Sequence, residues 1–229
     1  MRNIFRNFLT LFFPHLCVVC NCRLNESEKH ICLNCLSLLP KTNYHNQPNN
    51  RLEDFFAGRF PFEHITVFAY FVKGGSIQRV IHELKYRNNP DIGYFIGELY
   101  GIDIKDISFI SDIDYLVPVP LHPKRQKQRG YNQSLEIAKG ISNQTGIPID
   151  SATLIRAINN PSQTKSSRFE RWKNVEDIFT INNTDTFKGK HVLLIDDVIT
   201  TGSTIEACAK EILKSEGAKI SILTIGCAT

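Results

Sequence analysis

Apolar residues along the chain follow two patterns that alternate. Short apolar runs, typical of strands in a sheet covered on both faces, occur at five places: residues 64–71, 115–120, 153–158, 192–195 and 219–228. Apolar residues at helical spacing lie between several of these runs: residues 76–86, 92–101, 131–146 and 203–214. Strands that alternate with helices predict an α/β fold with a mainly parallel central sheet flanked by helices. We expect the last run to close that sheet.

The strand–helix unit near the C-terminus carries two adjacent acids. Asp196 and Asp197 directly follow the apolar run that ends at Ile195, and a helix begins at about Ser203 and stops before Gly217. In open α/β sheets, ligands bind beyond the carboxyl ends of the strands, where we expect this acidic pair to lie. Consecutive strand residues point to opposite sides, so the two acids need not have the same role.

A polar loop joins the acids to the helix. It offers hydroxyls and backbone N–H groups at a helix N-terminus, which suits a phosphate, from Thr200, Thr201, Gly202, Ser203 and Thr204. Glycine in this loop lets the backbone approach a ligand closely. The acids can accept hydrogen bonds from vicinal sugar hydroxyls, directly or through a magnesium ion. Together, these groups predict a sugar phosphate as the ligand.

Simpler explanations exist for the same residues. Aspartate, serine and threonine are common helix caps, and an aspartate pair after a strand also occurs in phospho-acceptor domains. A Walker phosphate loop is excluded, because the chain has no Gly-x-x-x-x-Gly-Lys. Caps alone do not account for the whole combination at this spacing.

Five of the seven cysteines lie in one short N-terminal segment. Two Cys-x-x-Cys pairs are separated by eleven residues: Cys17 and Cys20, then Cys32 and Cys35. Such pairs place four thiolates around a tetrahedral ion, so we predict a closed, structural zinc site. Three further residues could replace one ligand: Cys22, His15 and His30. The alternative is a set of unligated cysteines or a redox pair.

Length and composition are those of an ordinary globular protein. The 229 residues suffice for one domain and one small module, with 42% hydrophobic and 22% charged residues. We expect an N-terminal helix, the zinc module and a polar, Asn-rich linker (residues 41–51) to fill residues 1–50, and the larger domain to span 51–229. The net charge of +4 is too small to indicate nucleic acid by itself, although it is compatible with an anionic ligand.

The first residues superficially resemble a secretory signal, because Arg2 and Arg6 precede an apolar stretch at Phe8–Phe13. That stretch is short, and residues 14–16 make a poor cleavage site, so we interpret it as an amphipathic helix that packs on the protein. No stretch of the sequence approaches the ~18 apolar residues that a membrane-spanning helix needs. These features predict a cytoplasmic protein, in which cysteines stay reduced and bind metal.

Several stretches resemble known families. The segment VLLIDDVITTGST (residues 192–204) resembles the phosphoribosyl pyrophosphate (PRPP) signature of the type I phosphoribosyltransferases. The paired cysteines and three further stretches narrow the resemblance to the ComF family: HELKYRNN, VPVPLHPKRQKQRGYNQSLEIAKGI and NNPSQTKSSRFERWKNVEDIF. The similarity runs from about Phe13 to the C-terminus, with small departures at Asn160, where Thr is expected, and Ile178, where Ala is usual. Members of that family are associated with DNA uptake in naturally competent bacteria.

The resemblance implies a type I phosphoribosyltransferase fold that binds PRPP with Mg²⁺ at Asp196, Asp197 and Thr200–Thr204. The segment after the 115–120 strand is then positioned like the pyrophosphate loop of those enzymes. Lys124 and Arg129 would face the leaving group, where cations stabilise developing negative charge. A solvated basic face is the alternative.

Two further segments carry residues that could face an anion. By analogy, residues 161–174 form the mobile loop that closes over PRPP, with Lys165, Arg168 or Arg171 reaching the pyrophosphate. Lys85 and Arg87 could also face an anion, or lie on the surface. We expect the start of the helix at 131–133 to hold the pyrophosphate loop in shape rather than to contact substrate.

The resemblance leaves three functions open. The first is transfer of a phosphoribosyl group from Mg-PRPP to an unknown nitrogen acceptor. The second is a non-catalytic protein that binds PRPP or a nucleotide. The third is a DNA-uptake component that acts through single-stranded DNA or a partner helicase. Binding and catalysis need the same acids and the same threonine-rich loop, so the motif does not separate the first two.

Overall fold

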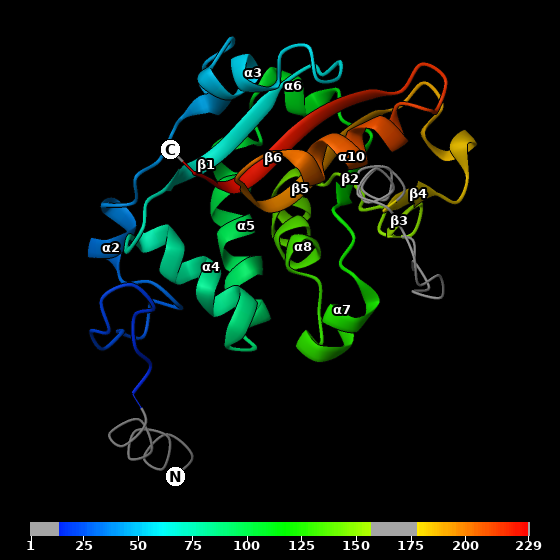
Figure 1. Cartoon of the computed structure of the whole chain (residues 1–229). Coiled ribbons are helices and arrows are strands. Elements are labelled where there is room, and N and C mark those ends of the chain that lie inside the picture. The colour runs from blue at the N-terminus through cyan, green and yellow to red at the C-terminus, as the bar shows by residue number, and fades with distance from the viewer. Residues whose placement is uncertain (1–13, 157–177, 229) are drawn as a thin grey trace.

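A computed structural model describes residues 14–156 and 178–228 (Figure 1). Its centre is a parallel sheet in the order β1 (Ile65–Phe71), β6 (Lys219–Ala228), β5 (His191–Ile199) and β2 (Tyr115–Pro118). Four of the five predicted strands and their parallel arrangement are thereby confirmed. The expectation that the last strand closes the sheet is wrong, because β6 lies inside it, between β1 and β5.

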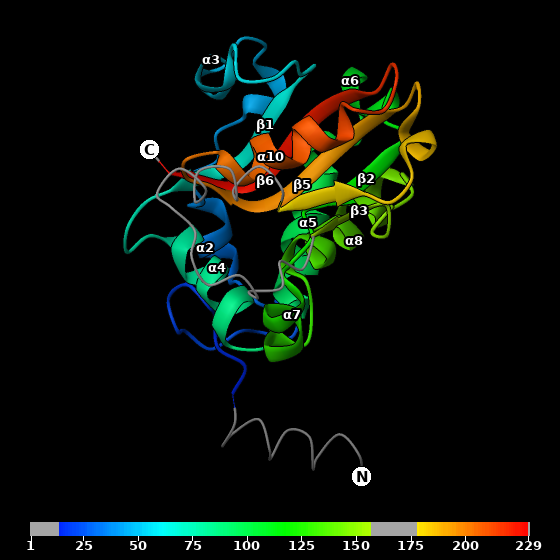
Figure 2. The same ribbon diagram turned by 45° about the vertical axis from the view of Figure 1, so that its right-hand side comes forward.

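Alternate residues of the strands enter two hydrophobic layers. In β5, Leu193 and Ile195 face one layer, whereas Val192 and Leu194 face the other. The first layer is covered by α4 (Ser76–Tyr86), α5 (Pro90–Ile104) and α8 (Gln133–Thr145), and the second by α3 (Arg51–Phe56) and α10 (Ser203–Ile212). Figure 2 shows α5 and α8 on the opposite side of the sheet from α10. Burial of both faces explains why the strands read as continuous apolar runs.

Gly97 and Gly140 bring the backbones of α5 and α8 into contact. A Cβ atom on Gly97 would lie 2.2 Å from the carbonyl oxygen of Ile137, and one on Gly140 would lie 2.1 Å from that of Tyr94. No larger side chain fits at either position unless the helices separate. This contact fixes the position of α8, whose first turn lies at the carboxyl edge of the sheet.

The strand predicted at 153–158 forms outside the central sheet. β3 (Leu154–Arg156) pairs antiparallel with β4 (Phe179–Ile181), which the apolar pattern did not predict. Leu154 and Phe179 pack in the same layer as α10, and this packing places the pair beside that helix rather than next to β2. The chain then continues through a short 3₁₀ helix, η2 (Thr184–Phe187), into β5.

The segment at 41–51 is packed on the domain and is not a free linker. The Thr42 N–H donates to the carbonyl oxygen of Phe68, and Asn50 Nδ2 donates to that of Ile65 at 2.9 Å. Thr42, Tyr44 and Asn50 are buried, and a 3₁₀ helix, η1 (Tyr44–Asn46), forms within the segment. The linker prediction is therefore wrong, because these polar groups bind the β1 backbone. A domain boundary after residue 50 stays a prediction.

Three short helices complete the described elements: α2 (Leu33–Ser37) precedes η1, α6 (Ser108–Ser111) lies between α5 and β2, and α7 (Pro123–Arg129) lies between β2 and α8. Within residues 14–156 and 178–228, every helix is too short or too polar to cross a bilayer.

Candidate functional site

The acidic pair lies inside strand β5, at the carboxyl edge of the sheet. β2 pairs with β5 only as far as Pro118, which lies opposite Ile195, whereas β6 pairs with β5 as far as Ile199. Asp196 and Asp197 are therefore strand residues, and the predicted strand end at residue 195 is corrected. Because β2 has already ended, this side of β5 is available to a ligand.

The two carboxylates are held from different helices. Ser134 Oγ, in the first turn of α8, donates to Asp196 Oδ1 at 3.0 Å, and the Asp197 N–H donates to the same oxygen at 2.9 Å. Lys85 Nζ, in the last turn of α4, donates to Asp197 Oδ1 at 2.8 Å in a largely buried ion pair. Lys85 is thus a counter-ion of the acidic pair, whereas Arg87 is exposed.

The acidic pair has an unusual ionisation. Burial, followed by the charge of the neighbouring Asp197, raises the pKa of Asp196 to about 7, although the hydrogen bonds to Asp196 oppose this shift. Such a carboxyl group changes its charge in the neutral range. A ligand that brings hydroxyl donors or a cation to this oxygen would favour the ionised form.

A cavity of about 250 Å³ lies in front of the acids. The residues that line it include both acids, Thr204 and three arginines, Arg125, Arg129 and Arg156. Acids and cations in one cavity suit a ligand with hydroxyls in one part and anionic groups in another.

Residues 200–204, which we call the cradle, comprise the turn after β5 and the first two residues of α10. Gly202, with φ of 73°, caps α10, which spans 10 residues from Ser203. The hydroxyl residues of the cradle are exposed, and Thr201 Oγ1 lies 3.1 Å from Ser203 Oγ. The cradle therefore presents hydroxyls and the N-terminal N–H groups of α10 next to the acidic pair.

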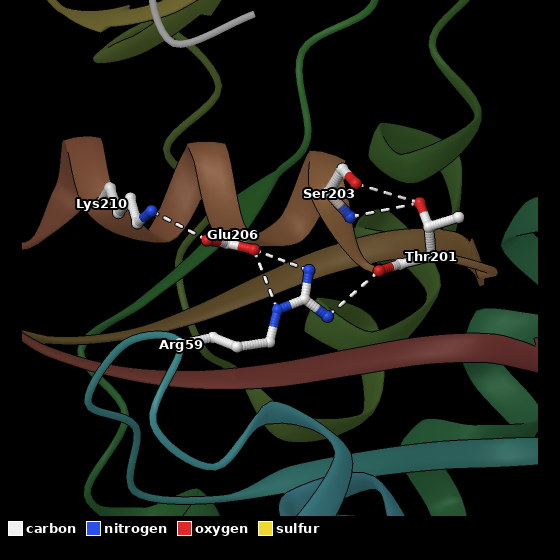
Figure 3. A network of polar contacts seen from close by, with 5 residues as sticks. All are labelled: Arg59, Thr201, Ser203, Glu206 and Lys210. Carbon is white, nitrogen blue, oxygen red and sulfur yellow. Dashed lines mark hydrogen bonds and ion pairs between the residues drawn. The ribbon is translucent and has the colours of Figure 1, made fainter. Parts of the chain in front are cut away.

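Arg59, in the turn after α3, connects the cradle to α10 (Figure 3). Arg59 Nη1 donates to the carbonyl oxygen of Thr201 at 3.1 Å, and Nε and Nη2 donate to Glu206 Oε2 at 2.9 and 2.6 Å. The other Glu206 oxygen accepts from Lys210 Nζ at 2.8 Å. No local pattern marks Arg59 in the sequence, because its partners lie more than 140 residues further along the chain.

The basic segment after β2 is a helix, α7 (Pro123–Arg129), rather than the expected loop. Proline at its first position and Gly130 after its last, with φ of 82°, set its ends. No residue of α7 is buried. Arg129 lines the cavity and lies over the Tyr86 ring, whereas Lys124 is not part of the cavity wall and Arg125 is.

The residues before and at the start of α8 have two roles. Asn132 Nδ2 donates to the Val119 carbonyl at 3.0 Å, and Asn132 Oδ1 accepts from the Ser134 N–H at 3.0 Å. Tyr131 OH donates to the carbonyl of a residue in α4. These two residues support the backbone, as expected. Asn132 also lines the cavity, as does Gln133, whose side chain is buried.

Three predicted ligand contacts lie outside the described residues: Lys165, Arg168 and Arg171. The described chain ends at Arg156 in β3 and resumes at Ile178, next to β4. Arg156, which the sequence reasoning missed, lines the cavity. Ser134 was missed as well, although it follows the Tyr-Asn-Gln stretch that had been singled out.

The N-terminal cysteines form a second cluster. Four sulfurs lie within 4.8 Å of one another: those of Cys17, Cys20, Cys22 and Cys32. Asn21, in a left-handed conformation with φ of 59°, turns the chain back toward Cys17, so that Cys22, one of the spare ligands of the sequence analysis, joins the group. Cys35 as a zinc ligand stays a prediction. The Cys35 thiol is buried beside the group, and burial followed by hydrogen bonds with neighbouring thiols raises its pKa.

Thiol geometry at this cluster fits a zinc ion. Two thiolates on a tetrahedral zinc lie ~3.8 Å apart, given Zn–S bonds of ~2.3 Å. The sulfurs of Cys20 and Cys32 are 3.7 Å apart. Four soft donors in this arrangement could bind a metal, and zinc is the ion that they suit best.

The chain is similar to a known family of domains and to several named proteins. The family described as "Phosphoribosyl transferase domain" matches residues 132–229. The DNA utilization protein YhgH of Escherichia coli (strain K12) is 25% identical over 210 residues, covering 90% of this chain and 88% of that protein. Competence protein F of Haemophilus influenzae is 24% identical over 215 residues, covering 89% and 93%. Competence protein ComFC of Bacillus subtilis is 36% identical over 111 residues, covering 48% and 43%. These similarities support a ComF family protein with a phosphoribosyltransferase-like domain.

The chain has a type I phosphoribosyltransferase-like domain beside its cysteine cluster. The domain match begins at Asn132, so it contains Ser134, the acidic pair and the cradle. Lys85, Arg129 and Arg59 precede the match. The site is therefore assembled from the matched domain and from the region before it.

Proposed function

We propose that the chain binds PRPP at the carboxyl edge of the sheet. The supporting observation is one cavity that places the acidic pair and Ser134 near Arg125, Arg129 and Arg156. Asp196 and Asp197 accept hydrogen bonds from the ribose hydroxyls, and the cradle (Thr200, Thr201, Gly202, Ser203 and Thr204) binds the 5-phosphate. The arginines face the pyrophosphate.

Magnesium fits the donor chemistry of this site, because hard cations prefer carboxylate and phosphate oxygens. Asp196 and Asp197 would hold it together with the oxygens of PRPP. When bound, the ion neutralises charge on the pyrophosphate. Lys85 supplies a positive charge at the same acids within the described structure.

The reaction we propose is displacement of pyrophosphate by a nitrogen nucleophile. The new C–N bond forms at the anomeric carbon as the C–O bond breaks, pyrophosphate leaves with the electron pair, and the nitrogen loses its proton to solvent. The chain contributes positioning and stabilisation of the charge on the leaving group, by Arg125, Arg129 and Arg156 at the cavity and by the loop residues Lys165, Arg168 and Arg171. We assign no general base.

Calorimetric titration with PRPP and magnesium tests this proposal. We expect binding to the zinc-loaded protein and its loss in an Asp196→Asn/Asp197→Asn variant. Asp114→Asn, at the opposite edge of the sheet, is the matched control. Absence of binding to the intact protein would refute the proposal. Pyrophosphate release with a panel of bases and amines then separates an enzyme from a PRPP-binding protein without turnover.

A second candidate is binding of single-stranded DNA by α7. Within the described residues, no carboxylate lies within ion-pair distance of Lys124, Arg125, Lys127 or Arg129, and Tyr86 beside Arg129 is 69% exposed. Unpaired cations with an exposed aromatic ring suit phosphates and stacked bases. Similar proteins carry the names DNA utilization protein and competence protein.

Oligonucleotide binding at low salt tests this second candidate. A Lys124→Gln/Lys127→Gln variant should lose affinity and salt dependence and keep PRPP binding, because neither side chain lines the cavity. If the intact protein shows no affinity for single-stranded DNA at low salt, direct DNA contact is excluded. Such a result would leave a partner protein, for example a helicase, as the link to DNA uptake.

A further inference from the structure

We propose that Arg59 is a positioning residue for the cradle, and that the region before β1 thereby sets the affinity for the phosphate end of the ligand. This inference rests on the proposed function in assigning a phosphate to the cradle. Its structural part, the conformation of residues 201–205, can be tested without any ligand.

The contact with Thr201 fixes the direction of one peptide N–H. A trans peptide is planar, so its carbonyl and its N–H point in opposite directions. Arg59 Nη1 holds the carbonyl of Thr201 at 3.1 Å. The N–H of Gly202 in the same peptide must then point away from Arg59, and the inference is that a bound anion accepts it.

Phe56 and Gly202 add a steric constraint. The Arg59 guanidinium lies 4.9 Å from the centre of the Phe56 ring. A Cβ atom on Gly202 would lie 2.6 Å from two atoms of that ring and 3.0 Å from Arg59 Nη1. Only glycine fits against this surface, and its φ of 73° is also a conformation that favours glycine. The cradle is therefore shaped against the arginine and the ring.

Arg59 also compensates a charge that opposes an anion. Glu206 lies in the first turn of α10, close to the N–H groups offered to a phosphate. Arg59 donates twice to one of its carboxylate oxygens, and Lys210 donates to the other. Without Arg59, one negative charge beside the cradle would lose a partner, and a bound phosphate would be repelled.

Paired variants test this role. Arg59→Lys keeps the charge but cannot contact Thr201 and Glu206 together, and Lys210→Met removes the other cation on Glu206 without touching Thr201. We expect Arg59→Lys to lower the binding affinity for ribose 5-phosphate and for PRPP by about tenfold or more. The affinity for inorganic pyrophosphate should change by less than about twofold, because pyrophosphate binds at the arginines of the cavity wall. Lys210→Met should change the affinities for all three ligands by less than about twofold.

Hydrogen exchange of the ligand-free proteins provides the second readout. Amides of residues 201–205 should exchange faster in Arg59→Lys than in the intact protein, while those of β5 and β6 keep their rates. Equal losses for all three ligands, or unchanged exchange at 201–205, would overturn the inference. If the intact protein binds neither PRPP nor ribose 5-phosphate, the proposed function fails, and the exchange rates alone decide whether Arg59 orders the cradle.

Discussion

The two edges of the parallel sheet carry similar residues in different environments. Each has a cavity with aspartates and a lysine, of about 250 Å³ at the carboxyl edge and about 280 Å³ at the amino edge. At the amino edge, Asp114 accepts from Lys190 Nζ at 2.9 Å and from the His191 N–H at 2.8 Å, and these donors lower its pKa. At the carboxyl edge, burial and a second carboxylate raise the pKa of Asp196.

The difference shows what distinguishes a site from a surface ion pair. At the amino edge, local donors satisfy the carboxylate, as in ordinary salt bridges that contribute little to stability. At the carboxyl edge, one lysine pairs with the buried Asp197 and one serine donates to the half-buried Asp196, so the charge of the two acids is only partly compensated. A ligand with hydroxyl donors can complete that compensation.

The largest effect should come from disturbing the scaffold of the carboxyl edge. Gly140→Ala places a methyl group against the α5 backbone, and relief requires the helices to move apart. We expect a loss of about 3 kcal/mol in the free energy of unfolding. Urea unfolding measures it, and Gly146→Ala, where a Cβ would meet open space in a left-handed turn, is the comparison. Equal losses in the two variants would contradict close helix packing as the cause.

Removal of one acid should break the site itself. Asp197→Asn loses the carboxylate that pairs with Lys85 and leaves that ammonium without its counter-ion. Calorimetry should show a loss of PRPP affinity of about 100-fold, or ~2.7 kcal/mol. An affinity within a factor of three of the intact protein would show that this acid does not contact the ligand.

The raised pKa of Asp196 predicts a pH dependence. Hydroxyl donors need the ionised form, so PRPP affinity should rise up to about tenfold as the pH increases through about 7. The folded-state pKa lies above the unfolded value, so this group stabilises the ligand-free protein at low pH, and that contribution is lost as the pH rises toward 7.

Asp196→Asn is the control for both measurements. Ionisation of the ligand phosphates is common to the two proteins, so the difference between them isolates Asp196. If the variant and the intact protein show the same pH profiles of affinity and of unfolding, the pKa assignment is wrong.

The smallest effect should come from the amino edge. Asp114→Asn removes an ion pair that is partly exposed, with side chains 44% and 34% accessible for Lys190 and Asp114. We expect less than about 1 kcal/mol in unfolding free energy and no change in PRPP affinity. A measurable loss of PRPP affinity would mean that the two edges are coupled and that Asp114 is more than a surface ion pair.

Local patterns predicted most of the fold and part of the site. Helices such as α4 and strands such as β5 were predicted because their apolar spacing is repeated over many residues. The acidic pair and the cradle were found because they are contiguous in the sequence. The antiparallel β3–β4 pair, Arg59 and Ser134 were missed, because each depends on contacts between distant segments. Cys22 joins the sulfur cluster through the turn at the left-handed residue Asn21, which no spacing rule reveals.

The strand order has a consequence for folding during synthesis. β1 pairs with β6 and, on its other side, makes only a single bridge at Lys41 within the described residues. Ile65 lies opposite Ile222, a separation of 222 − 65 = 157 residues. At an elongation rate of about 5–20 residues per second, β1, which is apolar on both faces, is synthesised ~10–30 seconds before its partner β6. The nascent chain therefore exposes this strand long enough for chaperones to bind it before the sheet can assemble.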